Sequence, residues 1–75
     1  MADKIRIGMI GVGQIGKSHL RRYQEIEGAD IVALADINEE EGQRVAAEFD
    51  IPHVYTDFHE MLERDDLQAV DVCFH

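Results

Sequence analysis

The chain has 75 residues, enough for one small domain, and its composition of 45% hydrophobic and 31% charged residues is typical of a globular protein. Sixteen acidic residues against seven basic ones give a net charge of −9, which argues against nucleic acids and anionic membrane surfaces as partners. No apolar run approaches the length of about 18 residues typical of a membrane span, and the N-terminus lacks the apolar region of a signal peptide, so we expect a cytoplasmic protein.

The first predicted element is a strand over residues 4–10, where apolar side chains alternate and then become continuous. Residues 11–16 (GVGQIG) follow directly, and residues 14–27 have the periodicity of an amphipathic helix. Gly28 lies just past the last periodic residue and is a candidate C-cap. A Gly-x-Gly-x-x-Gly loop between a strand and a helix is typical of a dinucleotide-binding fold.

Each position of this loop has an expected task in such a fold. Gly11 would permit the tight turn out of the strand, and Gly13 would let the backbone approach a pyrophosphate. Gly16 would let the helix pack closely on the strand. The N–H groups of Gln14 and Ile15 would face the phosphates at the positive end of the helix dipole. The alternative is a glycine-rich turn between a strand and a helix that binds no ligand.

The next predicted strand, residues 30–36, is almost continuously apolar, as expected for a parallel strand covered on both faces. It ends at Asp36, about 20 residues after the glycine loop, where the motif places an acid that binds the adenosine ribose hydroxyls. A carboxylate there would repel a 2′-phosphate, and neither Ile37 nor Asn38 offers a positive charge to bind one. NAD is therefore favoured over NADP, and the alternative is an ordinary aspartate at a strand end.

Asn38 opens a second predicted helix. Glu41 stands three residues later, which is the spacing of a capping box, in which each of the two side chains accepts a hydrogen bond from the other residue's backbone N–H. The helix is expected to end at Ile51, because the residue before Pro52 avoids the helical region.

Residues 53–55 form a short predicted strand near a sheet edge. Asp57 and Glu60 repeat the spacing of a cap and its third residue at the start of a short helix, and residues 69–74 form a fourth strand. The side chains of the short helix expected to face inward are Phe58, Met61 and Leu62.

The order βαβαβαβ with short connections predicts an α/β fold, the first half of a doubly wound (Rossmann) parallel sheet with strand order 3-2-1-4. Its ligand crevice would lie outside the carboxyl ends of strands 1 and 4, where the strand order reverses. Residues 1–75 would thus form a partial dinucleotide-binding domain that ends at strand 4 and binds the adenosine half of the cofactor.

The histidines and the cysteine have plain structural interpretations. His19 lies within the apolar arc of the first helix, which favours a packed, hydrogen-bonded histidine over a catalytic one. His53 and His59 are expected at the surface, and Lys17 on a solvated helix face. Cys73 is the only cysteine, so it forms no internal disulfide and gives no metal-ligand spacing, and we expect a small apolar residue in a buried strand.

With these residues in place, the chain resembles the N-terminal segment of the Gfo/Idh/MocA oxidoreductase family. His19 fits a histidine that is frequent in the first helix of the family, and residues 55–57 fit its Y-x-D step before the short helix. The resemblance is carried by residues 7–20 (IGMIGVGQIGKSHL), 32–38 (VALADIN), 46–62 and 66–73.

The resemblance implies the cofactor-binding part of an NAD-dependent dehydrogenase that acts on a sugar, polyol or related hydroxyl compound. It also implies cofactor contacts at Cys73 and Phe74, although Phe74-His75 replaces the family's usual Thr-Pro. The family's Glu-Lys-Pro motif and substrate domain would come after residue 75. No catalytic residue is therefore carried over, and the chain alone is expected to be inactive. The substrate would bind only through the missing domain, and a homo-oligomeric parent is compatible with this interpretation.

Two alternative functions belong to other classes. A non-enzymatic nucleotide-sensing module could use the same fold, and the continuation of the reading frame would distinguish it from an enzyme. A methyltransferase domain is disfavoured, because such domains place an acid two residues before the first glycine and this chain has Met9 there.

Overall fold

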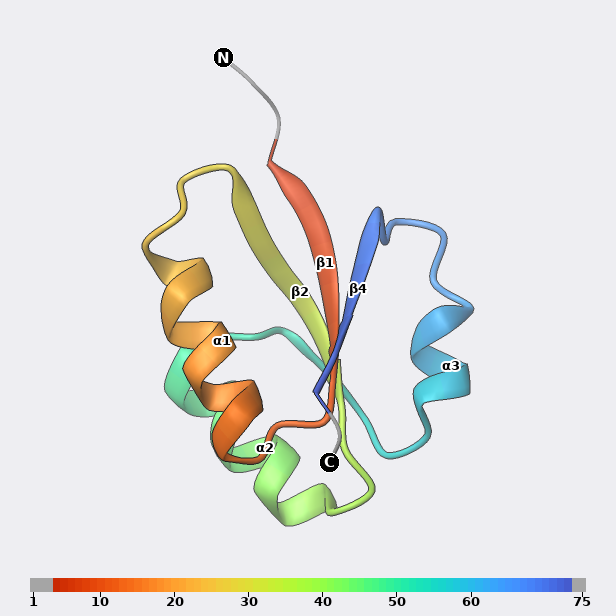
Figure 1. Cartoon of the computed structure of the whole chain (residues 1–75). Coiled ribbons are helices and arrows are strands. Elements are labelled where there is room, and N and C mark those ends of the chain that lie inside the picture. Colours follow the sequence, from red (N-terminus) through yellow and green to blue (C-terminus); the bar gives the residue numbers. More distant parts are fainter. Residues whose placement is uncertain (1–3, 74–75) are drawn as a thin grey trace.

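The structure, a computed structural model, describes residues 4–73. Strands and helices alternate along the chain (Figure 1), and the four strands form one parallel sheet in the order β3-β2-β1-β4. This confirms the predicted α/β class and the strand order 3-2-1-4. The elements are β1 (Ile5–Ile10), α1 (Gln14–Gln24), β2 (Ala29–Ala35), α2 (Glu39–Phe49), β3 (His53–Tyr55), α3 (Phe58–Leu62) and β4 (Ala69–Val72).

Helices cover both faces of the sheet, with α1 and α2 on one side and α3 on the other (Figure 1). Successive residues of a strand point to opposite faces, so β2 contributes Leu34 to the core under α1 and α2, and Ala33 and Ala35 to the core under α3. All three side chains are buried. The uninterrupted apolar run of this strand is therefore explained by burial on both faces.

The first helix is shorter than predicted. It ends at Gln24, and its C-cap is Glu25, whose N–H bonds to the carbonyl of Arg22 at 3.1 Å. Gly28 is therefore not the C-cap; its carbonyl instead accepts a hydrogen bond of 2.8 Å from the N–H of Ile5 at the start of β1. The turn after α1 is fixed by the beginning of the sheet rather than by a left-handed glycine.

The third helix also departs from the prediction. Its five residues make little more than one turn, so it buries one side chain fully, Met61, against the sheet. Phe58 packs beside it and is partly buried, as expected. Leu62 does not turn inward and is 45% exposed. A single helical turn presents too narrow a face to bury all three apolar side chains.

Only half of the predicted capping box forms at α2. The side chain of Asn38 accepts a hydrogen bond from the N–H of Glu41 at 3.1 Å, as expected. The N–H of Asn38 donates to the Oδ1 of Asp36 at 2.9 Å instead of to Glu41. The carboxylate of Glu41 is thereby free to pair with Lys17 of α1, at 2.6 Å.

Replacing Asn38 with alanine is expected to lower the free energy of unfolding by about 1 kcal/mol, because the N–H of Glu41 loses its acceptor. For a domain of this size that corresponds to a fall in Tm of about 4–8 °C, measurable by thermal unfolding followed by circular dichroism. Asn38→Ser keeps an acceptor at the cap and should stay close to the parent. Equal destabilisation by serine and alanine would show that the cap bond is not the cause.

Candidate functional site

The predicted site residues gather at the carboxyl end of the sheet. β1 runs into the glycine loop and β2 runs into Asp36, and the first turns of α1 and α2 begin beside them (Figure 1). The β1–β2 pairing places Ile10 opposite Ala35, so the glycine loop and Asp36 begin at the same level of the sheet. This is the end at which open α/β sheets bind ligands.

The glycine loop has the geometry that its sequence predicts. Gly11 has a φ of 86°, a left-handed conformation that glycine adopts without the cost of a β-carbon, and its N–H bonds to the carbonyl of Ala35 at 2.8 Å. A Cβ on Gly16 would lie 2.4 Å from the carbonyl oxygen of Gly11, so α1 starts in direct contact with the loop. A Cβ on Gly13 would meet no atom within 4 Å. The turn and packing roles of Gly11 and Gly16 are thus confirmed, and the approach of a pyrophosphate to Gly13 stays a prediction.

The N-terminus of α1 is left open to an anion. Gly13 is the N-cap and provides no side-chain hydrogen bond, and the first turn of α1 contains no acidic residue. The residues that follow, Gln14 and Ile15, are exposed. The first amides of a helix have no partner within the helix and carry its positive partial charge. These amides can therefore donate to a bound phosphate group.

Charged side chains beside the glycine loop form ion pairs with one another. The ammonium of Lys17, on α1, lies 2.6 Å from the carboxylate of Glu41, on α2, which also pairs with Arg44. These two cations, Lys17 first, lower the pKa of Glu41. The prediction that Lys17 lies on a simple solvated helix face is therefore wrong. Lys17 links the first turns of the two helices beside the glycine loop.

The carboxylate of Asp36 is hydrogen-bonded to the backbone of the glycine loop. Its Oδ2 accepts a hydrogen bond from the N–H of Val12 at 3.0 Å, and its Oδ1 accepts one from the N–H of Asn38 at 2.9 Å. A carboxylate has about four lone-pair positions, so both oxygens can accept further hydrogen bonds from ligand hydroxyls. The next residue, Ile37, is 93% exposed. Hydrophobic periodicity gave no sign of this exposure, because it treats every apolar side chain as a candidate for the core.

His19 is packed and hydrogen-bonded, as predicted, but sequence gave no sign of its partner. Its Nδ1 lies 2.8 Å from Oδ2 of Asp71 on β4, and the hydroxyl of Tyr23 donates to the same oxygen at 2.8 Å. The hydrogen bond from Tyr23 and the charge of Asp71 raise the pKa of the tyrosine. The arrangement fixes α1 against the edge of the sheet. His53 and His59 are exposed, as expected.

Cys73 is buried beneath the first turn of α1, as predicted. It does not lie in a buried strand, however: β4 ends at Val72, short of the predicted residue 74, and its four residues are exposed or only partly buried. A Cβ on Gly16 would lie 3.8 Å from the Cβ of Cys73. Burial and the neighbouring Asp71 carboxylate raise the pKa of the Cys73 thiol to about 11, so the sulfur is protonated at neutral pH. A contact of Cys73 with a cofactor stays a prediction, and Phe74 lies outside the described residues.

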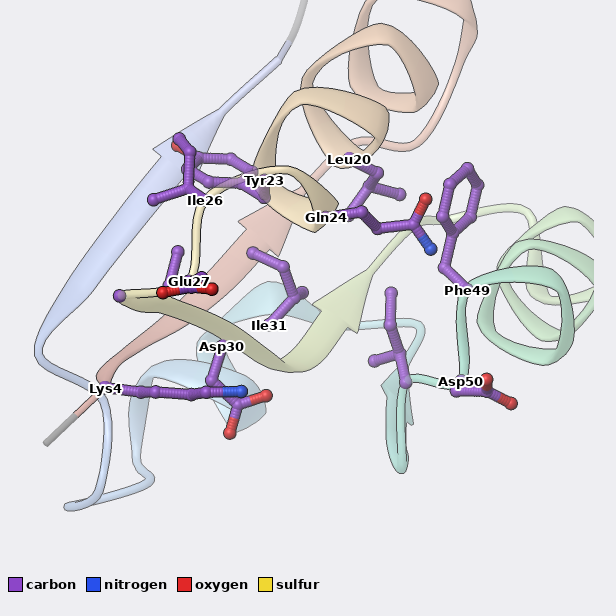
Figure 2. Close-up of a pocket in the computed structure, with 13 residues that line it drawn as sticks. Lys4, Leu20, Tyr23, Gln24, Ile26, Glu27, Asp30, Ile31, Phe49 and Asp50 are labelled. Carbon is purple, nitrogen blue, oxygen red and sulfur yellow. The ribbon is translucent and has the colours of Figure 1, made fainter. Parts of the chain in front are cut away.

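A hollow of about 920 Å³ lies at the other end of α1 (Figure 2). It is lined by the end of α1, the start of β2 and the end of α2, with Tyr23, Ile31 and Phe49 among its residues. It is remote from the glycine loop and contains none of the predicted site residues. Separately, no helix within residues 4–73 combines the length and apolar character needed to cross a membrane.

Comparison with known proteins gives one consistent result. Residues 5–75 match the Gfo/Idh/MocA model, described as an oxidoreductase family with an NAD-binding Rossmann fold. The chain is 41% identical over 71 residues to an inositol 2-dehydrogenase of Pseudomonas savastanoi pv. phaseolicola, a match covering 92% of this chain and 21% of that protein. It is 38% identical over 69 residues to a 4-carboxy-2-hydroxymuconate-6-semialdehyde dehydrogenase of Sphingobium sp., covering 92% and 22%.

Solved structures of dehydrogenases have the same fold as this chain. The crystal structure of scyllo-inositol dehydrogenase from Lactobacillus casei with bound NAD(H) and scyllo-inositol superposes with a TM-score of 0.89 at 27% identity, covering 97% of this chain and 22% of that one. A probable dehydrogenase from Thermotoga maritima gives a TM-score of 0.89 at 32% identity, covering 95% and 21%. The chain thus spans about a fifth of the length of the curated relatives that it matches.

Proposed function

Because the chain belongs to the Gfo/Idh/MocA family of oxidoreductases, which has an NAD-binding Rossmann fold, we propose that it binds the adenosine and pyrophosphate half of NAD. The observation that carries this proposal is the hydrogen bond between Asp36 and the N–H of Val12. It joins the acid expected to hold the ribose to the loop expected to hold the pyrophosphate. The two parts of the site are therefore held at a fixed spacing before any ligand arrives.

The pyrophosphate would lie over Gly13, against the first amides of α1. The open space at Gly13 lets phosphate oxygens come close to the backbone, and Gln14 and Ile15 are exposed there. Hydrogen bonds from backbone amides to a charged acceptor are stronger than those between neutral groups. Binding by fixed backbone dipoles also explains how a chain with net charge −9 holds an anion.

The ribose would be bound by Asp36 and the adenine would lie against Ile37. An adenine ring on this side chain would cover an apolar group that is otherwise almost fully exposed. A 2′-phosphate on that ribose would face Asp36 and the acidic first turn of α2, where Glu39 and Glu40 are exposed. Repulsion from these carboxylates favours NAD over NADP.

We further propose that the parent protein is a dehydrogenase acting on a sugar, polyol or related hydroxyl compound. Two of the relatives named above are inositol dehydrogenases, whereas a third is named for a semialdehyde, so the family does not share one substrate. NAD, when bound, supplies the hydride acceptor. The described residues of this chain bind and orient it, and none of them is assigned a catalytic role.

Calorimetric titration of the chain with cofactor fragments tests the proposed half-site. We expect ADP-ribose to bind about as tightly as NAD, and nicotinamide mononucleotide to bind at least about tenfold more weakly, a difference of about 1.4 kcal/mol. NMR signals of residues 11–16 and 36 should shift with ADP-ribose. Equal affinity for nicotinamide mononucleotide and ADP-ribose would contradict the proposal, as would signal changes confined to the hollow beside Phe49.

A further inference from the structure

Three side chains with different metal-binding atoms meet between α1 and β4. The Nδ1 of His19 lies 2.8 Å from Oδ2 of Asp71 and 3.4 Å from Sγ of Cys73. The same sulfur lies 3.5 Å from Oδ1 of Asp71. Nitrogen, oxygen and sulfur donors thus lie within 4.8 Å of one another, although His19 and Asp71 are 52 positions apart in sequence.

These separations are close to those of a metal centre. Zinc binds histidine nitrogen and carboxylate oxygen at about 2.0–2.2 Å and cysteine sulfur at about 2.3 Å, so neighbouring tetrahedral ligand atoms lie about 3.3–3.8 Å apart. The Cys73–His19 and Cys73–Asp71 distances already fall in this range. The His19–Asp71 pair, now hydrogen-bonded, would have to separate by about 0.5 Å to reach it.

The surroundings of the cluster suit a soft divalent cation. The hydroxyl of Tyr23 donates to Asp71 and orients its carboxylate, as the outer partners of metal ligands commonly do. The Sδ of Met9 lies 3.5 Å from the Cys73 sulfur and adds a second soft atom nearby. The side chain of His19 is 37% exposed, which gives an ion a route from solvent to the buried thiol.

We propose that His19, Asp71 and Cys73 bind a divalent transition-metal ion, with zinc the ion that fits their donor set. The Cys73 thiol would release its proton to solvent as its sulfur binds the metal. A fourth position would be filled by water or by another ligand. The site is distinct from the proposed NAD half-site but adjoins it, because Cys73 lies beneath Gly16 in the first turn of α1. Binding of metal there would fix the second turn of α1, through His19, to the end of β4.

The test is titration of the reduced chain with Co²⁺ and Zn²⁺. Co²⁺ should produce the visible bands of four-coordinate cobalt and a near-ultraviolet thiolate-to-cobalt band, which can come only from the single cysteine. Zinc-loaded chain should show one sulfur neighbour at about 2.3 Å by X-ray absorption. Absence of the thiolate band and of the sulfur neighbour overturns the proposal. Both measurements use the unaltered chain, so the result does not depend on the folding of a variant.

Three variants then identify the ligands. Cys73→Ser and His19→Gln should each weaken Zn²⁺ binding by at least about a hundredfold, since loss of even an outer partner commonly costs 10–100-fold. His59→Gln is the matched control, because His59 also pairs with an aspartate, Asp57, at 2.9 Å, but without a cysteine beside it among the contacts of residues 4–73. It should leave the affinity unchanged. An equal loss in His59→Gln, or unchanged binding in Cys73→Ser, would overturn the assignment.

Discussion

Gly13→Ala is expected to weaken NAD binding at least about tenfold while the chain stays folded, whereas Gly16→Ala is expected to unfold or strongly destabilise it. The two glycines belong to the same motif, but their surroundings differ. A methyl group on Gly16 would lie 2.4 Å from the carbonyl oxygen of Gly11, which is backbone and cannot rotate away. Overpacking of this kind costs about 1–3 kcal/mol and sometimes more. Domains this small are marginally stable, so that loss is a large part of the total.

At Gly13 the added methyl group meets nothing within 4 Å, and the φ of −65° is acceptable to alanine. Gly13 is, however, the N-cap of α1, a position at which alanine is less favourable than glycine, so we expect a small loss of stability of about 0.5–1 kcal/mol that leaves the chain folded. The same methyl group would occupy the space through which the pyrophosphate approaches the backbone. We expect the affinity for NAD to fall at least about tenfold, equivalent to about 1.4 kcal/mol.

Calorimetry for affinity and thermal unfolding for stability separate the two effects. Gly28→Ala is the control, because a Cβ there also meets nothing within 4 Å and Gly28 lies at the far end of α1. Gly28→Ala should cause neither the loss of NAD affinity expected for Gly13→Ala nor the fall in Tm expected for Gly16→Ala. Parent-like NAD affinity in Gly13→Ala would refute close backbone approach, and a parent-like Tm in Gly16→Ala would refute the packing role of that glycine.

Local pattern predicted which elements form and in what succession, and the strand order followed from the rule for doubly wound sheets. Strand periodicity and the cap at Asn38 each act within a few residues, so the sequence contains the information directly. The glycine motif likewise predicts its own turn, because the positive φ of Gly11 and the contact of Gly16 with Gly11 involve neighbouring residues. The end of α2 was predicted less well: the helix ends at Phe49 instead of Ile51, because Asp50 adopts a left-handed conformation with a φ of 56°.

Contacts that depend on tertiary register could not be predicted in the same way. His19 meets Asp71 only because β4 pairs with β1 in one particular register, which places Met9 opposite Asp71. Lys17 meets Glu41 because α1 and α2 begin at the same end of the sheet, and this pairing replaces half of the expected capping box. A residue's chemistry is visible in sequence, but its partner across 24 or 52 positions is not.

Asp36→Ala is expected to lower the affinity for NAD by at least about tenfold and to reduce its preference over NADP. The carboxylate is the proposed acceptor for the ribose hydroxyls, and its charge opposes a 2′-phosphate. Loss of the carboxylate should therefore weaken the binding of NAD more than the binding of NADP. The alanine variant also loses the hydrogen bonds to the N–H groups of Val12 and Asn38, so part of the loss would come from a loosened glycine loop.

Asp36→Asn separates these contributions, because an amide keeps one oxygen acceptor but loses the charge and the second acceptor. If charge sets the preference, Asn and Ala should reduce the NAD-to-NADP affinity ratio alike, while Asn retains more of the NAD affinity. Asp30→Asn makes the same change in net charge at the exposed opposite end of β2 and should leave the ratio unaltered. A ratio that Asp36→Ala leaves unchanged would show that Asp36 is an ordinary strand-end aspartate that only holds the backbone at Val12 and Asn38.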